Sequence, residues 1–468
     1  MDDLIGFTAR EAVTALKQGD VSPLELVNAA AARIEVVDGA VNALPTLCLE
    51  RAREHAHRLM ARERAARGPL AGLPLAVKDL VDVAGVRTTY GSPIYADHVP
   101  ERSDVMVETL EARGGIVLAK SNTPEFGAGA NTFNEVFGKT LNPWDVRLTC
   151  GGSSGGSAVA LATGEVWLAT GSDLGGSLRT PASFCAVVGF RPGPGRVATG
   201  PGPLPFDDLA VEGPMARTVG DVALMFDAMT GAHGEDPRSI PAPEQPFMDA
   251  VDAPAAPGRV AFSRDLGITP VDAEVATICE QAAQRFADFG AAVEAACPDF
   301  SGAVETFQTL RAARFVAGRA PLLGEHRDKL KPDVIWNIEK GLALSADDIG
   351  AAARARGALF HRVARFFRNY DLLLCPAAIV PPFDVNERYV SALGGVEFDN
   401  YVDWLAITFA ITLTSCPSLC VPCGFTANGL PVGLQIVGPP RGEAGVLAAG
   451  ALFEEAAGLS HELPIDPR

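Results

Sequence analysis

Two clusters of glycine and serine are the parts of this sequence best suited to nucleophilic chemistry. The first reads Gly-Gly-Ser-Ser-Gly-Gly-Ser over 151–157, and the second reads Gly-Ser-Asp-Leu-Gly-Gly-Ser-Leu-Arg over 171–179. Glycines beside a serine let consecutive backbone N–H groups point at one place, where they can hold a phosphate or an oxyanion. Apolar runs at 158–163 and 166–169 lie between the clusters, which is unusual for flexible linkers. The clusters therefore predict turns that bind an anion.

The motif around the first cluster is compatible with a nucleophilic serine at either of two positions. No GxxxxGK[ST] string is present, so a Walker-type phosphate loop is not predicted. GxSxG occurs twice in overlap, with Ser153 or Ser154 at its centre, as in the nucleophile elbow of α/β-hydrolases. That fold needs a downstream histidine, and the available ones are His233, His326, His361 and His461. An esterase of this kind stays an alternative.

Lys78 is a further candidate for the base that activates a serine, besides the histidines. It follows the apolar run 75–77, where a charged side chain is costly to bury without a partner or a function. Lysine at its ordinary pKa of about 10.4 is protonated near neutrality, so burial or nearby positive charge would have to lower this pKa. An ion pair with Asp79 at the end of a strand is the structural alternative.

The surrounding pattern alternates between helices and strands. Capping boxes at 8–11 and 22–25 predict two helix starts. Further helices are predicted over 46–64, 104–113, 272–290 and 346–369, and apolar strands over 73–77, 115–119, 372–374 and 419–421. The alternation predicts an α/β fold with helices on both faces of a sheet. The glycine and proline density of 150–213 predicts mainly loops, and 236–258 reads as a surface excursion.

Composition restricts the class of partner. The chain of 468 residues has 39 basic and 57 acidic side chains, a formal net charge of −18, which would repel nucleic acid and anionic membranes. Residues 405–440 carry no Asp, Glu, Lys or Arg, but their prolines and glycines favour buried strands and turns over a membrane span. An acidic N-terminus and nine cysteines favour the cytoplasm. We expect a small-molecule partner, neither nucleic acid nor membrane, with a homodimer left open.

Three cysteines late in the chain have the CxxxCxxC spacing of iron–sulfur ligands. Two prolines interrupt the string formed by Cys416, Cys420 and Cys423. We therefore expect these cysteines to be core residues, and we predict neither a metal nor another cofactor.

Taken together, the clusters and Lys78 resemble the diagnostic motifs of the amidase signature hydrolases. Matching strings are Ala-Val-Lys-Asp at 76–79, Ser-Asn-Thr-Pro-Glu-Phe at 121–126, Asn-Pro-Trp at 142–144 and Pro-Ala-Ser-Phe-Cys at 181–185. The resemblance covers essentially the whole chain and implies a mixed, twisted central sheet covered by helices on both faces. We expect one domain over 1–468, comprising N-terminal helices (1–66), a catalytic core (67–235), the excursion (236–258), a helical insertion (259–370) and a C-terminal return to the sheet (371–468).

The resemblance also implies which residues form the active site. The Ser-cisSer-Lys triad of the family becomes Ser177, the nucleophile, with Ser153 and Lys78, and the peptide before Ser153 would be cis. Backbone N–H groups of the second cluster would form the oxyanion hole, namely those of Leu174, Gly175, Gly176 and Ser177. Gly127 would contact substrate, and supporting side chains would be Ser154, Ser172, Asp173 and Arg179.

The implied activity is cofactor-free hydrolysis of a C–N bond in a neutral small or medium carboxylic amide through an acyl-enzyme. Esters and carbamates (urethanes) are further candidate substrates. A non-catalytic amidotransferase-like subunit is a second alternative beside the esterase. In the branch that works on charged tRNA the nucleophile motif is commonly followed by Gln, whereas this chain has Thr180.

Two uncharged segments, 126–133 and 405–414, are expected to wall the substrate pocket. A pocket without arginine or lysine would disfavour an acidic acyl group, because burying an unpaired carboxylate is costly. Arg314 and Arg319 would overturn this expectation if they fold over the site.

Overall fold

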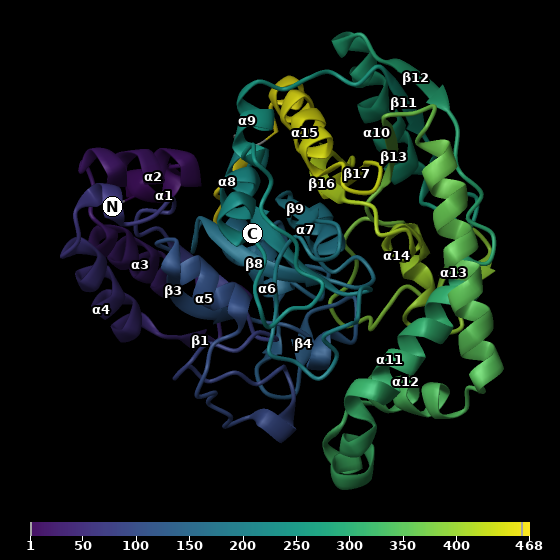
Figure 1. Cartoon of the computed structure of the whole chain (residues 1–468), viewed down its shortest axis with the longest axis horizontal. Coiled ribbons are helices and arrows are strands. Elements are labelled where there is room, and N and C mark those ends of the chain that lie inside the picture. Colours follow the sequence, from purple (N-terminus) through teal and green to yellow (C-terminus); the bar gives the residue numbers. More distant parts are fainter. Residues whose placement is uncertain (1, 460–461) are drawn as a thin grey trace.

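A mixed sheet of eleven strands organises the computed structural model, which describes residues 2–459 and 462–468 (Figure 1). Its strands in spatial order are β1 (Thr46–Leu47), β3 (Ile116–Ser121), β2 (Pro74–Lys78), β8 (Leu168–Asp173), β10 (Val211–Ala216), β9 (Val188–Arg191), β16 (Ser418–Phe425), β17 (Pro431–Val437), β13 (Leu372–Pro376), β11 (Arg259–Phe262) and β12 (Ala292–Ala295). Strand β2 pairs in parallel with β3 and β8, and β11 pairs in parallel with β12 and β13. The other pairings of this sheet are antiparallel, which confirms the predicted mixed sheet.

Helices bury both faces of the sheet, as predicted. Along β13, Leu372 and Leu374 belong to one hydrophobic cluster, and Leu373 and Cys375 belong to another. Because successive side chains of a strand point to opposite faces, each face of β13 is covered. The helices are α1 (Asp2–Gly6), α2 (Ala9–Gln18), α3 (Pro23–Val41), α4 (Leu49–Met60), α5 (Val105–Ala112), α6 (Gly155–Ala162), α7 (Arg179–Cys185), α8 (Val219–Met229), α9 (Phe247–Asp252), α10 (Ala273–Gln284), α11 (Ala303–His326), α12 (Pro332–Leu342), α13 (Ala346–Phe366), α14 (Ala406–Leu413) and α15 (Glu443–Ala457).

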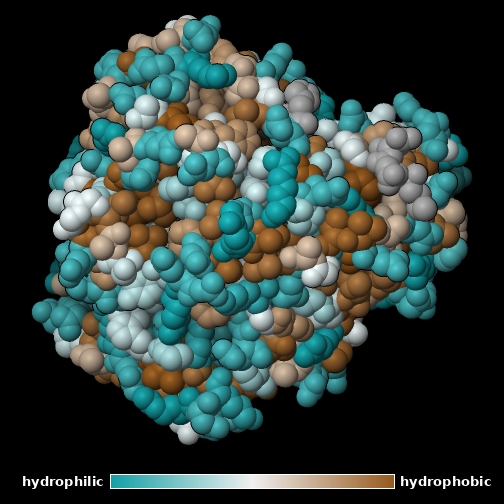
Figure 2. Space-filling view, turned by 180° about the vertical axis from the view of Figure 1, so that it is seen from behind, coloured by the Kyte–Doolittle hydropathy of each residue, from teal (hydrophilic) through white to brown (hydrophobic). Residues whose placement is uncertain are grey.

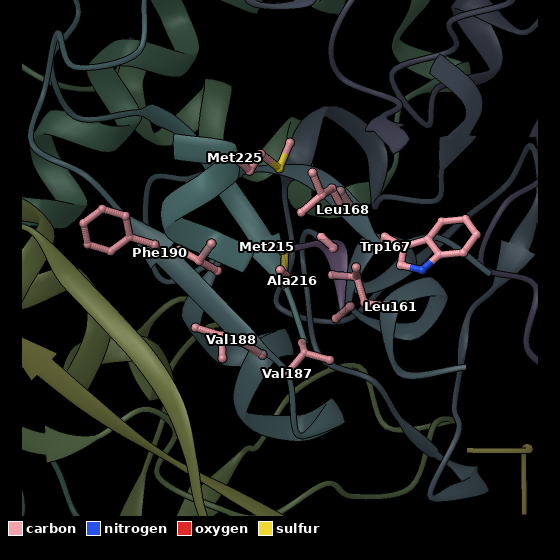
Figure 3. Packing of buried hydrophobic residues seen from close by; sticks show 14 of the residues in the cluster. Leu161, Trp167, Leu168, Val187, Val188, Phe190, Met215, Ala216 and Met225 are labelled. Carbon is pink, nitrogen blue, oxygen red and sulfur yellow. The ribbon is translucent and has the colours of Figure 1, made fainter. Parts of the chain in front are cut away.

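The centre of the core lies where β8, β9 and β10 meet α6 and α8. Figure 3 shows Leu168, Phe190 and Met215, one from each of these strands, packed among aliphatic neighbours. Their side chains are fully buried. Burial of a side chain of this size stabilises the fold by about 2 kcal/mol, so the three strands are held firmly at the point from which the site is built.

The predicted N-terminal helix starts are confirmed. The Thr8 side chain accepts from the backbone N–H of Glu11, and the Thr8 N–H donates to the Glu11 carboxylate at 2.8 Å. Ser22 and Glu25 form the same reciprocal pair. A continuous helix over 46–64 is wrong, because Thr46–Leu47 pairs with the edge of β3 before α4 begins at Leu49.

The expectation of mainly loops over 150–213 is confirmed in that just over half of these residues lie outside helices and strands, but the stretch also contains buried elements. This stretch contains α6, β8, α7 and β9 and is largely buried. Its glycines serve close packing: a Cβ on Gly156 would lie 2.3 Å from the backbone nitrogen of Asn122. Glycine density here therefore reflects tight contact between backbones.

Later segments also contribute to the sheet. The predicted helical insertion supplies β11 and β12 as well as α10 to α13, and the excursion over 236–258 contains α9. The uncharged stretch 405–440 forms α14, β16 and β17. Within the described ranges, no helix has the length and apolar character needed to span a membrane.

Short strand pairs extend from the body of the fold, namely β4 (Phe133–Asn134) with β5 (Gly138–Lys139), β6 (Leu141–Asn142) with β7 (Asp145–Thr149), and β14 (Ala392–Leu393) with β15 (Val396–Glu397). The face opposite to that of Figure 1 is a mosaic of hydrophilic and hydrophobic residues (Figure 2).

Candidate active site

A cavity of about 640 Å³ lies where β2 and β8 end, and it contains both glycine- and serine-rich clusters. Ser153, Ser172 and Ser177 line it together with Leu174 and Gly127. A hollow of similar size, about 660 Å³, lies beside α2, but no serine, cysteine, histidine or lysine lines it. The chemistry predicted from the sequence therefore falls in the first cavity, at the ends of neighbouring parallel strands.

Lys78 lies at the centre of the three serine hydroxyls. It is the last residue of β2 and is fully buried. Its Nζ lies 2.7 Å from Ser153 Oγ, 2.8 Å from Ser154 Oγ and 2.9 Å from Ser172 Oγ. The alternative ion pair with Asp79 is wrong, because that carboxylate faces Lys120 Nζ at 3.1 Å instead.

Burial gives Lys78 the protonation state of a base. It lowers the pKa of Lys78 to about 7, against the opposing influence of the Glu212 and Asp173 carboxylates. A substantial fraction of the lysine is therefore neutral near pH 7, whereas an ordinary lysine would be almost entirely protonated.

The first cluster holds Ser153 against the lysine. The peptide between Gly152 and Ser153 is cis, as the resemblance implies. A Cβ on Gly155 would lie 2.2 Å from Thr132 Oγ1, so glycine is required where this turn enters α6. Ser154 links the first cluster to β8, because its Oγ accepts a hydrogen bond from the Ser172 N–H at 3.3 Å.

Asp173 shapes the second cluster. Its carboxylate accepts from the N–H groups of Gly176 at 3.0 Å and Leu178 at 3.2 Å. Burial alone would raise its pKa, but the guanidinium groups of Arg179 and Arg191 lower it to about 2. The permanently ionised carboxylate thus folds the chain into the turn that presents Ser177.

The turn modifies the expected oxyanion hole. The Gly176 N–H donates to Asp173, so Leu174, Gly175 and Ser177 remain as the backbone donors available to an oxyanion. Gly176 itself has φ +118°, and a Cβ there would lie 2.4 Å from Thr408 Oγ1. Its role is therefore to permit the turn.

The remaining supporting residues tie the turn to distant strands. Arg179 is fully buried, with its Nε 3.0 Å from Asp173 and its Nη1 2.7 Å from Gln435 Oε1. Ser177 is partly exposed to the cavity, and its carbonyl accepts from the Ser154 N–H at 3.2 Å. The two clusters are thus joined by backbone as well as through Lys78.

Positively charged residues line the same cavity, among them the two arginines that the sequence analysis named as able to overturn the expectation of an uncharged pocket. Arg314 and Arg319 of α11 reach it, so the expectation of a pocket without positive charge is wrong. Arg314 pairs with Asp207 at 2.5 Å, whereas the Arg319 guanidinium lies 4.5 Å from the centre of the Phe126 ring. Residues 405–414 were expected as a wall, but α14 packs into the core instead, where Phe409 stacks on Phe307.

Glu212 was missed by the sequence analysis, although an acidic residue within the apolar run of β10 was a visible signal. It lines the cavity with the serines. By contrast, the histidines proposed for an esterase do not reach it: His233, His326 and His361 lie elsewhere, and His461 lies outside the described residues. The basic side chain that contacts Ser153 and Ser154 is Lys78.

The late cysteines lie in and beside β16. Cys416 and Cys420 are buried, and Cys423 Sγ lies 3.9 Å from Cys279 Sγ. Over residues 2–459 and 462–468, no cluster of three or more His, Cys, Asp or Glu side chains is arranged to hold a metal ion.

Comparison with known proteins identifies the family of the chain. Residues 25–447 match the family model described as Amidase. An acylamidase of Rhodococcus erythropolis is 34% identical over 464 residues, which span 98% of this chain and 97% of that protein. A glutamyl-tRNA(Gln) amidotransferase subunit of Moorella thermoacetica is also 34% identical, over 97% of each chain.

Solved structures are similar over the same length. A bacterial aryl acylamidase of the amidase signature family superposes with a TM-score of 0.91 at 29% identity, covering 97% of each chain. 6-Aminohexanoate cyclic dimer hydrolase, complexed with substrate, has a TM-score of 0.89 at 25% identity and covers 99% of this chain and 100% of that chain. The sequence motifs, the sheet and the match over nearly the whole length agree, and the chain belongs to the amidase family, that of the amidase signature enzymes.

Proposed function

We propose that this protein is a serine amidohydrolase that cleaves the C–N bond of an uncharged small or medium carboxylic amide through an acyl-enzyme. Ser177 is the nucleophile, Ser153 relays its proton, and Lys78 is the base. The observation that carries the proposal is the buried Lys78 Nζ, 2.7 Å from Ser153 Oγ at the wall of the cavity that contains Ser177.

In the first half of the reaction, Ser177 Oγ attacks the carbonyl carbon of the amide. Its proton passes to Ser153 Oγ, while the Ser153 proton passes to the neutral Lys78 amine. The negative charge on the carbonyl oxygen is stabilised by the N–H groups of Leu174, Gly175 and Ser177, and one such donor is worth about 3 kcal/mol. The transition state therefore gains contacts that the planar amide lacks.

Collapse of the tetrahedral intermediate returns the proton. Lys78 gives it back through Ser153 to the leaving nitrogen, the C–N bond breaks, and the acyl group stays on Ser177 as an ester. Water then attacks this ester with the same relay taking its proton, and Ser177 is released as the alcohol with the carboxylic acid product. No cofactor enters either step.

Substrate choice follows from the charges on the cavity wall. Arg314 is neutralised by Asp207, and Arg311 is held by the Tyr401 hydroxyl at 2.6 Å. The wall also includes the aromatic side chains of Phe126 and Tyr95. These features support an uncharged acyl group with apolar or aromatic character, and the acylamidase relatives agree with that class. Esters and carbamates are secondary substrates in this proposal.

A fluorophosphonate probe followed by peptide mapping tests the assignment. Label on Ser177 that disappears in Ser177→Ala supports it. Label on Ser153 or Ser154 instead would support the esterase alternative. A parallel screen of anilides, esters and carbamates measures which bond is cleaved.

The amidotransferase relatives support a second candidate, a subunit that works only within a complex. The purified chain distinguishes the two. Amide hydrolysis by the isolated protein supports the amidohydrolase, whereas an isolated chain that neither hydrolyses amides nor accepts the probe supports the role within a complex.

A further inference from the structure

The carboxyl group of Glu212 lies on the side of the cavity nearest to Lys78. In the antiparallel pairing of β8 and β10 it lies directly opposite Ser172. Opposed side chains of an antiparallel pair share one face of the sheet, with Cβ atoms about 5 Å apart. The Ser172 hydroxyl lies 2.9 Å from Lys78 Nζ, so the geometry brings Glu212 next to the same amine.

The carboxyl group is not part of any other network among the described residues. Its Oε2 is enclosed and has no hydrogen-bond partner there, although it lines the cavity with Ser153 and Ser177. An enclosed, unpartnered carboxyl oxygen is costly, and such a group requires an explanation. The opposite end of β10 is ordinary core, as Figure 3 shows for Met215 and Ala216, so Glu212 is the polar exception at the end that faces the site.

Other charges near the pair are already engaged. Asp104 accepts from the N–H groups of Met106 and Gly200, and Arg314 is paired with Asp207. On the side of the lysine, Asp173 is held by two arginines, Arg179 and Arg191. Of the two cations that lower the pKa of Glu212, Lys78 and Arg314, only Arg314 is paired with another carboxylate among the described residues.

Burial acts on the two groups in opposite directions. It raises the pKa of Glu212, which Lys78 partly offsets, and it lowers the pKa of Lys78, which Glu212 partly offsets. Both groups thus prefer the neutral form, and the pair with one proton is divided between an ammonium–carboxylate form and an amine–carboxylic acid form. The ammonium–carboxylate form delays the appearance of the neutral lysine as the pH rises.

We propose that Glu212 is a positioning residue that shares one proton with Lys78 and thereby sets the pH at which the lysine becomes the neutral base. This inference rests on the proposed function. The residue acts through Lys78, so its effect must appear in the pH dependence of the nucleophile and not only in the amount of activity.

The test measures the rate at which a fluorophosphonate labels Ser177 as a function of pH, which needs no knowledge of the natural substrate. Glu212→Gln and Glu212→Leu both remove the charge, one keeping polarity and the other keeping an apolar packing volume. Because a carboxylate can only favour the protonated amine, each neutral variant should move the acid limb of the profile to lower pH, by about one unit. Glu212→Asp keeps the charge and should lie closer to the parent protein.

Glu454→Gln is the matched control. Burial raises the pKa of Glu454 to about 8 as well, but its carboxylate accepts from the Val219 N–H beside α8 and lies outside the catalytic cavity. This variant should leave the acid limb where it is in the parent. Urea titration of each variant confirms that the labelled protein is folded.

The possible outcomes distinguish the role of Glu212 from the proposed function. Ser177 labelled in the parent, with a limb that does not move or moves upward in a folded neutral variant, overturns the role of Glu212 alone. No label on Ser177 in the parent overturns the proposed function and, with it, this inference. A downward shift in the neutral variants, absent in the Glu454 control, supports both.

Discussion

Replacing Lys78 with methionine should change stability in a way that depends on pH. Methionine keeps the length of the side chain but removes Nζ from its position among the three serine hydroxyls. In the unfolded chain the lysine is protonated below its ordinary pKa of 10.5, whereas the native pKa is about 7, so folding between these values must release a proton. Wild-type stability therefore rises with pH across this window, because the unfolded state binds more protons.

The magnitude follows from the two pKa values. The cost of holding the lysine neutral is about 4 kcal/mol at pH 7 and about 2 kcal/mol at pH 9. Methionine carries no proton and escapes this cost, while the hydrogen bonds lost by Ser153, Ser154 and Ser172 do not depend on pH. Glu212, left without its cation, becomes harder to ionise, which lowers the stability of the variant at pH 9. The stability of Lys78→Met relative to wild type should therefore fall by at least about 2 kcal/mol from pH 7 to pH 9.

Urea unfolding followed by circular dichroism at pH 7 and pH 9 measures this difference. Lys17→Met, which removes an exposed lysine of α2, is the control for the loss of a surface charge. A difference between Lys78→Met and wild type that stays constant over the two pH values would refute the reasoning, because it would show that the native lysine is not held neutral.

Three further predictions concern activity. Ser177→Ala should abolish turnover and probe labelling while leaving urea unfolding unchanged, and activity within tenfold of wild type would exclude Ser177 as the nucleophile. Lys78→Ala should slow an amide more than an activated ester by about 10²-fold or more, because only the amine leaving group needs the returned proton; equal losses on matched substrates would count against the relay. An amide with a terminal carboxylate should be cleaved with lower kcat/KM than its neutral match, because Arg314 is already paired with Asp207. Arg319, for which the described residues supply no acidic partner, would partly offset this penalty, so Arg319→Met should widen the gap. Better turnover of the charged amide would reject the preference for neutral substrates.

The sequence predicts which residues meet at this site better than it predicts their surroundings. Lys78, Ser153 and Ser154 could be named because their motifs are local strings, and the structure brings them within hydrogen-bond distance. Ser177 was named in the same way, and its place in the shared cavity agrees with the motif.

Residues that reach the site from distant segments could not be placed there from the sequence, even where they were named as candidates. Arg319 lies on α11, and no local pattern shows which cavity a helix of that length faces. Glu212 could be suspected only as an acidic residue in an apolar strand, since its relation to Lys78 depends on the pairing of β8 with β10. The burial of 150–213 could not be read from its composition for a similar reason, because glycine that permits a loop and glycine that permits close packing look alike in a sequence.

The contacts of Arg179 make the nucleophile turn dependent on segments that are synthesised long after it. One guanidinium joins Asp173, which shapes the turn, to the Thr408 carbonyl of α14 and to Gln435 of β17. A nascent chain that ends before Gln435 lacks one of these acceptors, and a buried guanidinium with fewer hydrogen-bond partners destabilises the turn that it holds. We therefore expect the turn that carries Ser177 to reach its final geometry only after α14 and β17 have joined the fold.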